Sequence, residues 1–423
     1  MRQLRTRGQP AALEAVGAAA AGRLPHAALL VGPPSIGKTT LALDIAAALL
    51  CLHPERSDRP CGACRGCRLV HDGNHPDLHR LRPAGPGGQI GIAQVRELSA
   101  ALALLPVEGG ARVAVIESAH RLNEDAQNAL LKTLEEPPAG VTILLAADDE
   151  ERLLPTVHSR CVTFRLGPTG SRDIEALVTG LGLADSPTAA RLARIAAGRP
   201  GLAVAYARAP EAAAARSEVA RVVLDLLGER PARRLAAARD LLATAGAATA
   251  ALDAAAGRQP GTDAGTPPEP AAGRRRGRGG ARADAISTAE EPASGQGLAA
   301  EEVDRGEEAD GPPAIRTPAA ARRRAAAWLI EAWRDVARDL ALAASGNPAG
   351  LRMPELLEEY LAAASVTDAG EMSRFLVRCV RAAERIEANV SPELEIDTLV
   401  LAWPTAPARA ATTTTAGARR SSG

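Results

Sequence analysis

Eight residues near the start of the chain match the phosphate-binding loop G-x-x-x-x-G-K-[ST] at every fixed position. They run from Gly32 to Thr39, between a strand-like apolar run at 27–31 and a helix-like run at 41–50. The backbone of such a loop wraps a phosphate, and the N-terminus of the next helix adds its dipole. The lysine reaches the outer phosphates and the Thr hydroxyl can hold Mg²⁺. The pattern predicts a nucleotide site at Gly32, Gly37, Lys38, Thr39 and Thr40; a glycine-rich turn without a ligand is the weaker alternative.

The composition supports this reading of Lys38. Of the 50 basic residues, only Lys38 and Lys132 are lysine, and all others are arginine. In a chain so biased towards arginine, a retained lysine marks a place that arginine would not serve. A compact ammonium fits a phosphate cradle better than a planar guanidinium does. The sequence gives no equally specific reason for Lys132.

Four cysteines lie close together in the spacing C-x9-C-x2-C-x2-C. Four thiolates within reach of one point form a closed tetrahedral zinc site, which holds a loop in shape and offers no open position for catalysis. An iron–sulfur cluster or a set of free thiols is the alternative. His71, His75 and His79 could replace a ligand, but we expect them to be solvated loop residues. The predicted metal ligands are Cys51, Cys61, Cys64 and Cys67.

Length and composition exclude several classes of protein. The chain has 423 residues, a net charge of zero and a pI of about 7.1, so no global basic field indicates nucleic-acid binding. Phe164 is the only aromatic residue before position 200, which argues against a stacking platform for bases. The N-terminus does not resemble a signal peptide, and no run of about 18 apolar residues predicts a membrane span. We therefore expect a cytoplasmic protein without membrane contact.

The order of apolar runs predicts a mixed α/β and all-α chain. Short runs at 27–31, 113–116, 141–146 and 162–166 alternate with helix-like segments, as a parallel sheet covered on both faces requires. This core should span 1–168, with residues 51–82 inserted as the zinc module. A small helical lid should follow at 169–208.

The remaining residues predict a helical domain divided by a polar insert. Its two parts, at 209–252 and 320–404, carry apolar residues at helical spacing, such as Leu329, Trp333, Val336 and Leu340. Ser391 and Pro392 should begin the last helix. Residues 253–319 are rich in Gly, Pro, Arg and Glu, so we expect a disordered linker, and we expect a disordered tail at 405–423.

Several local patterns together resemble the delta-prime subunits of bacterial DNA polymerase III clamp loaders, in the AAA+ superfamily. They include the four-cysteine insertion, and cover most of the first 165 residues. A weaker similarity to the family's C-terminal collar lies at 389–392. The other segments that carry the resemblance are GRLPHA at 22–27, GNHPD at 73–77, NALLKTLEEPP at 128–138 and SRC at 159–161.

The resemblance implies an AAA+ core, a lid and a collar in a hetero-pentamer. In such a loader, motor subunits bind and hydrolyse ATP, and a delta subunit and the delta-prime stator complete the ring. The assembly opens the sliding clamp and places it on primed DNA, as part of the DNA polymerase III (nucleotidyltransferase) holoenzyme. The implied cofactors are structural zinc and, as an optional ligand, ATP with Mg²⁺.

The same resemblance implies that this chain does not hydrolyse ATP by itself. If the segment 116–120 stands where motor subunits have I-D-E-x-H, Glu117 replaces the metal-binding Asp, and Ser118 replaces the Glu that activates water. A Ser hydroxyl is a poor base at neutral pH. The polar residue expected at the tip of the 141–146 strand is matched by Ala147, and the lid arginine by Gly201.

Arg160 in the SRC segment remains as a catalytic candidate. An arginine placed on a neighbouring subunit's nucleotide stabilises transition-state charge in trans, an effect of roughly 10³–10⁵ in rate. A structural ion-pair role is the alternative for this side chain.

Two other functions compete with the stator reading. One is the ATP-hydrolysing gamma/tau motor of the same loader, against which stand Ser118, Ala147 and Gly201. The other is an independent zinc-containing nucleic-acid-binding protein, which the neutral charge and the scarce aromatics oppose.

Overall fold

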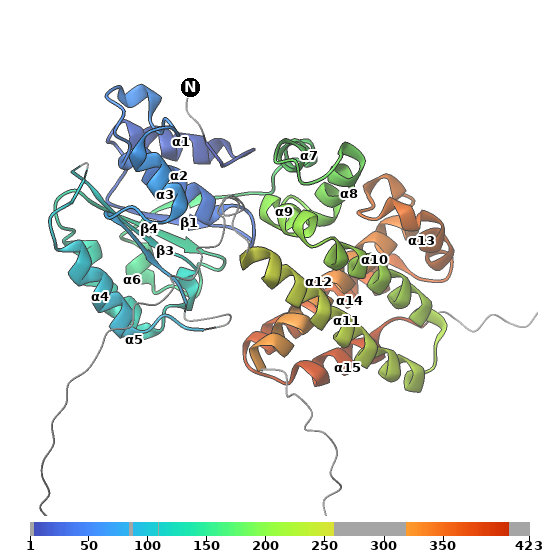
Figure 1. The fold of residues 1–423 in the computed structure, drawn as a ribbon. Coiled ribbons are helices and arrows are strands. Elements are labelled where there is room, and N and C mark those ends of the chain that lie inside the picture. The colour runs from blue at the N-terminus through green and yellow to red at the C-terminus, as the bar shows by residue number, and fades with distance from the viewer. Residues whose placement is uncertain (1–3, 84–87, 109, 258–318, 406–423) are drawn as a thin grey trace, which may run out of the picture. The chain divides into compact units, whose positions relative to one another are not determined.

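A computed structural model describes residues 4–83, 88–108, 110–257 and 319–405. The described residues of its N-terminal part form a five-stranded parallel sheet in the order β2-β3-β4-β1-β5 (Figure 1). In register, Leu29 of β1 lies beside Leu145 of β4, and Ala114 of β3 lies beside Ile143 of β4. The strands are β1 Ala27–Val31, β2 Leu78–Leu81, β3 Arg112–Ile116, β4 Val141–Ala147 and β5 Val162–Arg165.

Both faces of this sheet are covered by helices, which explains why its central strands are apolar throughout. Alternate residues of β1 enter different cores: Leu30 packs with α1, α2 and α3, and Leu29 packs with α4 and α5. Figure 1 shows these two helical layers on either side of the strands. The predicted parallel α/β core is therefore confirmed. Its helices are α1 Pro10–Ala20, α2 Lys38–Leu49, α3 Arg65–Asp72, α4 Ile92–Leu102, α5 Glu124–Glu135 and α6 Pro155–His158, with 3₁₀ turns η1 Arg56–Asp58 and η2 Ala119–Arg121.

The described residues after β5 are helical and share one hydrophobic core that extends from Ile174 to Trp403. At its centre the rings of Trp333, Phe375 and Trp403 pack with centroids 4.7–5.8 Å apart. The helices are α7 Ser171–Gly180, α8 Ser186–Ala196, α9 Pro200–Arg208, α10 Pro210–Asp225, α11 Pro231–Gly257, α12 Ala319–Ala344, α13 Leu357–Ala364, α14 Ala369–Glu387 and α15 Pro392–Ala402, with 3₁₀ turns η3 Leu226–Gly228, η4 Pro348–Gly350 and η5 Pro354–Leu356.

Several sequence expectations for the helical part can be compared with these elements. Ser391 accepts a hydrogen bond from the backbone N–H of Leu394 and Pro392 begins α15, as predicted. Helix α11 continues to Gly257, past the expected end at Leu252. Of the expected linker 253–319 and tail 405–423, residues 258–318 and 406–423 lie outside the described residues.

A buried polar network connects the helices expected for the lid and for the collar. The hydroxyl of Tyr206 on α9 accepts hydrogen bonds from Arg216 of α10 at 3.0 Å and from the indole N–H of Trp328 on α12 at 3.2 Å. Arg216 also pairs with Asp335 of α12, and both side chains are almost completely buried. The lid and the collar ranges thus contribute to one continuous core.

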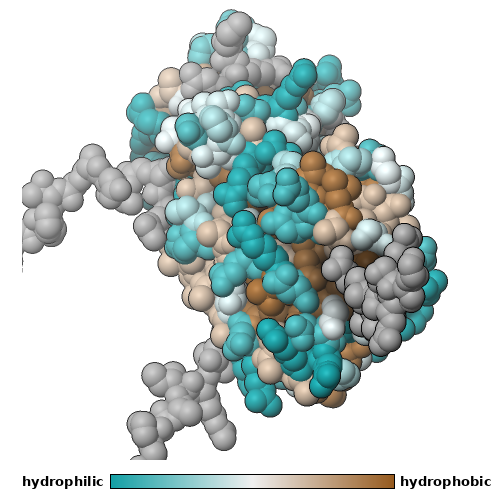
Figure 2. All heavy atoms as spheres, turned by 90° about the vertical axis from the view of Figure 1, so that its right-hand side faces the viewer, coloured by the Kyte–Doolittle hydropathy of each residue, from teal (hydrophilic) through white to brown (hydrophobic). Residues whose placement is uncertain are grey.

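Two surface features of the helical part remain. Residues Pro231–Ala256 of α11 are long and apolar enough to cross a membrane by length and composition alone, a test that core helices of water-soluble proteins also pass. Exposed apolar side chains also occur on α13 and α14, at Leu361, Val377 and Val380. Figure 2, which faces the right-hand side of Figure 1, shows hydrophobic patches between hydrophilic side chains.

Candidate functional site

The predicted phosphate-binding loop connects strand β1 to helix α2. The strand ends at Val31, and α2 begins at Lys38, directly after Gly37. Gly37 has φ 110°, a conformation that favours glycine, and Ser35 adopts φ 62° within the loop. Thr39 and Thr40 follow in the first turn of α2 and are partly exposed. The structure thus has the strand–loop–helix arrangement that a nucleotide phosphate site requires.

Two glycines are needed where other backbone passes close to this loop. A Cβ on Gly32 would lie 2.6 Å from the carbonyl oxygen of Leu166. A Cβ on Gly201, in the first turn of α9, would lie 2.9 Å from the carbonyl oxygen of Ser35. The N–H of Gly201 donates a 2.9 Å hydrogen bond to that same oxygen. Gly201, which stands where a lid arginine is expected, therefore contacts the loop through its backbone.

Lys38 is almost completely buried, and its ammonium contacts three oxygens. It donates to the carbonyls of Gly32 and Pro33, at 2.7 Å each, and pairs with Asp148 Oδ1 at 2.5 Å. Asp148 directly follows β4, whose last residue Ala147 lies beside Val31. Ala147 is at the tip of β4, as expected, and the side chain that reaches the loop belongs to Asp148, one residue further along.

His120 fixes the backbone at the end of β4. Its Nδ1 accepts a 3.1 Å hydrogen bond from the N–H of Asp148, and its Nε2 lies 3.8 Å from Asp148 Oδ2. Burial lowers the pKa of His120, although the Asp148 carboxylate opposes this shift. Sequence reasoning missed Asp148; the run of acidic residues directly after the apolar strand was the available signal.

Glu117 and Ser118 follow β3 at the same edge of the sheet. Glu117 Oε1 accepts hydrogen bonds from Arg80 at 2.6 and 2.9 Å and from Arg82 at 2.8 Å. Ser118 has φ 57° and ψ 50°, a left-handed conformation that is uncommon for a residue with a side chain. Glu117 stands at the position expected for the metal-binding carboxylate, and two arginines hold its side chain.

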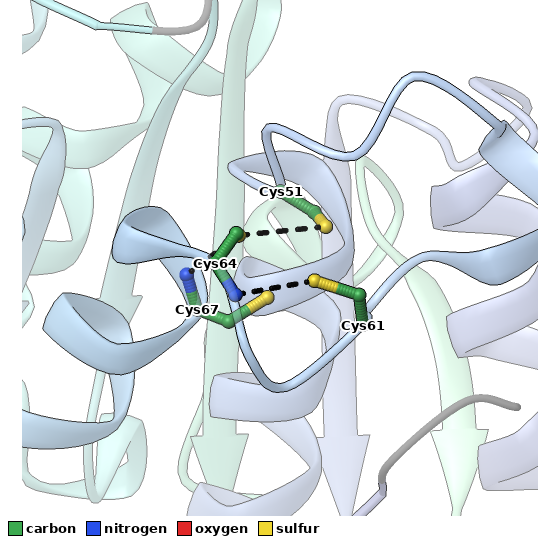
Figure 3. Close-up of side chains that lie close together, drawn as sticks. All are labelled: Cys51, Cys61, Cys64 and Cys67. Atoms are coloured by element: carbon green, nitrogen blue, oxygen red, sulfur yellow. Dashed lines mark hydrogen bonds between the residues drawn. The ribbon is translucent and has the colours of Figure 1, made fainter.

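The four predicted metal ligands converge at the module between α2 and β2. Their sulfur atoms all lie within 4.8 Å of one another, and Cys51 Sγ is 3.8 Å from Cys64 Sγ. Tetrahedral zinc with Zn–S bonds of about 2.3 Å holds its sulfurs roughly 3.8 Å apart. Figure 3 shows the side chains pointing towards a common centre. The arrangement fits a metal such as zinc.

Local structure prepares these thiols for a metal. Cys64 caps α3, and its sulfur accepts a hydrogen bond from the N–H of Cys67; Cys61 accepts one from the N–H of Cys64. Although burial opposes it, backbone hydrogen bonds lower the pKa of Cys64 to about 7, whereas burial raises the pKa of Cys67. A dication offsets the cost of ionising buried thiols together.

The nearby histidines differ from the expected solvated loop residues. His71 lies on α3 and His79 on β2, and burial lowers the pKa of each. His75 is only 3% exposed, and its Nδ1 accepts a hydrogen bond from the N–H of Asp77. They are structural side chains, and within the described residues the candidate metal cluster contains cysteines only.

Arg160 follows helix α6, before β5. Its Nη1 donates to the carbonyl of Thr156 at 2.9 Å, and its Nη2 lies 2.5 Å from Glu135 Oε1 at the end of α5. The side chain is 34% exposed, so its guanidinium is within reach of solvent. The geometry allows both the ion-pair role and contact with another molecule.

The N-terminal part of the chain is similar to known proteins. The family model described as DNA polymerase III, delta subunit, matches residues 8–170. Over these residues, which are less than half of the chain, the sequence is similar to that family. The DNA polymerase III subunit delta' of Escherichia coli K12 is 39% identical over 186 residues, which cover 44% of this chain and 55% of that protein. The delta' subunit of Pseudomonas aeruginosa is 44% identical over 137 residues, 32% of this chain and 42% of that protein.

The motor-type subunits are related as well. The tau/gamma subunit of Haemophilus influenzae is 40% identical over 144 residues, 34% of this chain and 20% of that protein. This chain spans about half the length of the curated delta' relatives it matches. A DNA polymerase III gamma subunit-related protein from Thermotoga maritima covers 92% of this chain and 97% of its own, with 15% identity and a TM-score of 0.38.

Proposed function

We propose that this chain is the delta-prime stator subunit of a DNA polymerase III clamp loader. Three observations support the proposal: the delta' relatives at about 40% identity, the replacement of a catalytic base by Ser118, and the accessible Arg160. The assembly would combine this chain with motor and delta subunits in a hetero-pentamer. It would load the sliding clamp onto primed DNA in the cytoplasm, during replication.

The proposed organisation is that of an AAA+ subunit. Residues 1–168 form the core with its module at 51–82, residues 169–208 form the lid, and residues 209–252 with 320–404 form the collar. The parallel sheet with its phosphate-binding loop and the helical core after β5 support this division. Cys51, Cys61, Cys64 and Cys67 would hold structural zinc, which shapes the module and takes no part in chemistry.

The proposed chemical contribution is an arginine supplied in trans. Arg160 would leave Glu135 and approach the terminal phosphate of a neighbouring motor subunit's nucleotide. A guanidinium there stabilises the charge that develops as the phosphate is transferred to water. The single observation that carries this role is the partly exposed guanidinium within the SRC segment, whose one charged partner among the described residues is the exposed carboxylate of Glu135.

The nucleotide site of this chain has a different part in the proposal. Gly32, Gly37, Lys38, Thr39 and Thr40 would hold a nucleotide with Mg²⁺, and Glu117 would face the ion. No base corresponding to the water-activating glutamate follows, because that position is Ser118. The site would therefore bind nucleotide and not turn it over.

Steady-state ATP hydrolysis, by the chain alone and in the assembled loader with clamp and primed DNA, tests this function. We expect no turnover by the chain alone and a lower loader rate with Arg160→Ala, at unchanged assembly. Arg165→Ala is the matched control, because Arg165 is an exposed arginine five residues away that pairs with Glu150. Turnover of about one per second by the chain alone would make it a motor subunit instead. An unchanged loader rate with Arg160→Ala would reject the role in trans.

A further inference from the structure

The ammonium of Lys38 has all three of its N–H donors engaged inside the protein. Two contact the carbonyls of Gly32 and Pro33, and the third meets the carboxylate of Asp148 at 2.5 Å. In a phosphate-binding loop this ammonium reaches the β- and γ-phosphates of a nucleotide. Here a carboxylate of the same chain occupies the position of an anion beside it.

The position of Asp148 is fixed by the sheet. Strands β1 and β4 are parallel neighbours, with Val31 beside Ala147, so the first residue after β4 emerges next to the first residue of the loop. The N–H of Gly32 donates to the carbonyl of Ala147, which ties the two strand ends together. On the other side, His120 accepts from the N–H of Asp148. The backbone of Asp148 is thus held in place on both sides, which fixes where its carboxylate can lie.

A carboxylate at this place discriminates between nucleotides by charge. The terminal phosphate of a triphosphate would need the ammonium that Asp148 holds, and it would bring further negative charge against the Asp148 oxygens. A diphosphate ends one phosphate earlier, so its β-phosphate can use the loop N–H groups while the Asp148 contact stays in place. The carboxylate is 34% exposed, so the two anions meet at an accessible surface.

We propose that Asp148 takes the place of a terminal phosphate, so that the loop of this chain binds a nucleoside diphosphate in preference to a triphosphate. The inference rests on the proposed nucleotide site and names its ligand class. It also assigns a role to the residue after β4 that is independent of Arg160. The nucleotide bound by this chain would then stay the same when the motor subunits hydrolyse theirs.

Binding of ADP and of the non-hydrolysable triphosphate analogue adenylyl imidodiphosphate, each with Mg²⁺, to the full chain tests this inference by calorimetry. We expect ADP to bind at least about tenfold more tightly. Asp148→Asn keeps the shape of the side chain and removes its charge, so it should strengthen binding of the triphosphate analogue about tenfold and change ADP binding little. Asp149→Asn is the control, because Asp149 is the neighbouring carboxylate and pairs with Arg152 at 3.4 Å.

Each contrary result has its own meaning. Equal affinities in the natural chain, or no binding of either nucleotide to both the natural chain and Asp148→Asn, would overturn the inference. A parallel loss of both affinities in Asp148→Asn, with a lower unfolding temperature, would show a structural role only and reject the inference as well. Loader stimulation through Arg160 is measured separately, so failure here leaves the proposed stator function standing.

Discussion

The guanidinium of Arg160 and the carboxylate of Glu135 form an ion pair, with Nη2 2.5 Å from Oε1. Arg160 lies in the SRC segment, and Glu135 is the last residue of helix α5. The carboxylate therefore holds, within the isolated chain, the group that we assign to a neighbour's nucleotide.

Glu135→Gln should release Arg160 without destabilising the protein. Both side chains are substantially exposed, and pairs of this kind contribute up to about 1 kcal/mol to the free energy of unfolding. We expect ATP hydrolysis by the assembled loader to stay equal or rise up to a few-fold. A fall as large as that caused by Arg160→Ala would instead show that Glu135 positions the arginine.

Cys64→Ser should remove the bound metal. The thiol joins α3 to the rest of the cluster, and three remaining sulfurs cannot close a tetrahedral site. Elemental analysis should find about one zinc per natural chain and much less in the variant. Cys161→Ser is the control, since that cysteine lies outside the cluster, and a natural chain without zinc would contradict the assignment.

Gly32→Ala should damage the phosphate-binding loop. The added Cβ would meet the Leu166 carbonyl oxygen at 2.6 Å, so the loop must shift at a cost of roughly 1–3 kcal/mol. We expect a lower midpoint in urea and nucleotide binding weakened at least about tenfold, since 1.4 kcal/mol is a factor of ten. Gly180→Ala is the control, because no atom lies within 4 Å of a Cβ there. If Gly32→Ala bound nucleotide normally, the close contact between Gly32 and the Leu166 carbonyl would be contradicted.

Asp335→Asn should destabilise the helical part strongly. Asp335 pairs with Arg216 and Arg352, and Arg216 is 1% exposed, so the variant leaves buried positive charge without its partner. Breaking a buried pair in this way costs about 3–5 kcal/mol. Urea unfolding measures the loss. Glu393→Gln, in an exposed pair with Arg322, should change the free energy of unfolding by less than about 1 kcal/mol. Similar effects of the two substitutions would reject the buried network.

Acid should destabilise the N-terminal part in a manner that depends on His120. Burial holds the pKa of His120 in the folded state below the usual histidine value of about 6.5, so near and below that pH the unfolded chain binds the proton more readily. Stability from the neutral ring is present at pH 7.5 and is lost as the pH falls. His120→Asn keeps an acceptor for the Asp148 N–H and should lose less stability between pH 7.5 and 5.5. Equal losses would rule out this contribution.

Local spacing was sufficient to predict the sites whose residues lie close together in the chain. One loop and one helix start position the strand–loop–helix at Gly32 to Lys38, and another such pair positions the C-x2-C-x2-C sulfurs, so the structure shows both local arrangements at the predicted residues. Asp148 was missed because its contact depends on the register of two strands, Val31 beside Ala147, which no local pattern specifies.

Contacts between distant segments could not be predicted from periodicity. The apolar spacing of α12 identified Leu329, Trp333, Val336 and Leu340 as core residues, and all four are buried. It said nothing of Asp335 on the same helix, which is also buried. Its partner Arg216 is 119 positions away, so only the tertiary fold shows that the charge is compensated.

The ion pair between Asp253 of α11 and Arg324 of α12, 2.9 Å long, has a consequence for how this chain can vary. The polypeptide leaves the helical core and re-enters it at nearly the same point. The end of α11 and the start of α12 therefore lie close together. Each doubling of such a closed loop adds only about 0.6 kcal/mol of closure entropy. Insertions of very different length are therefore compatible with the same helical core.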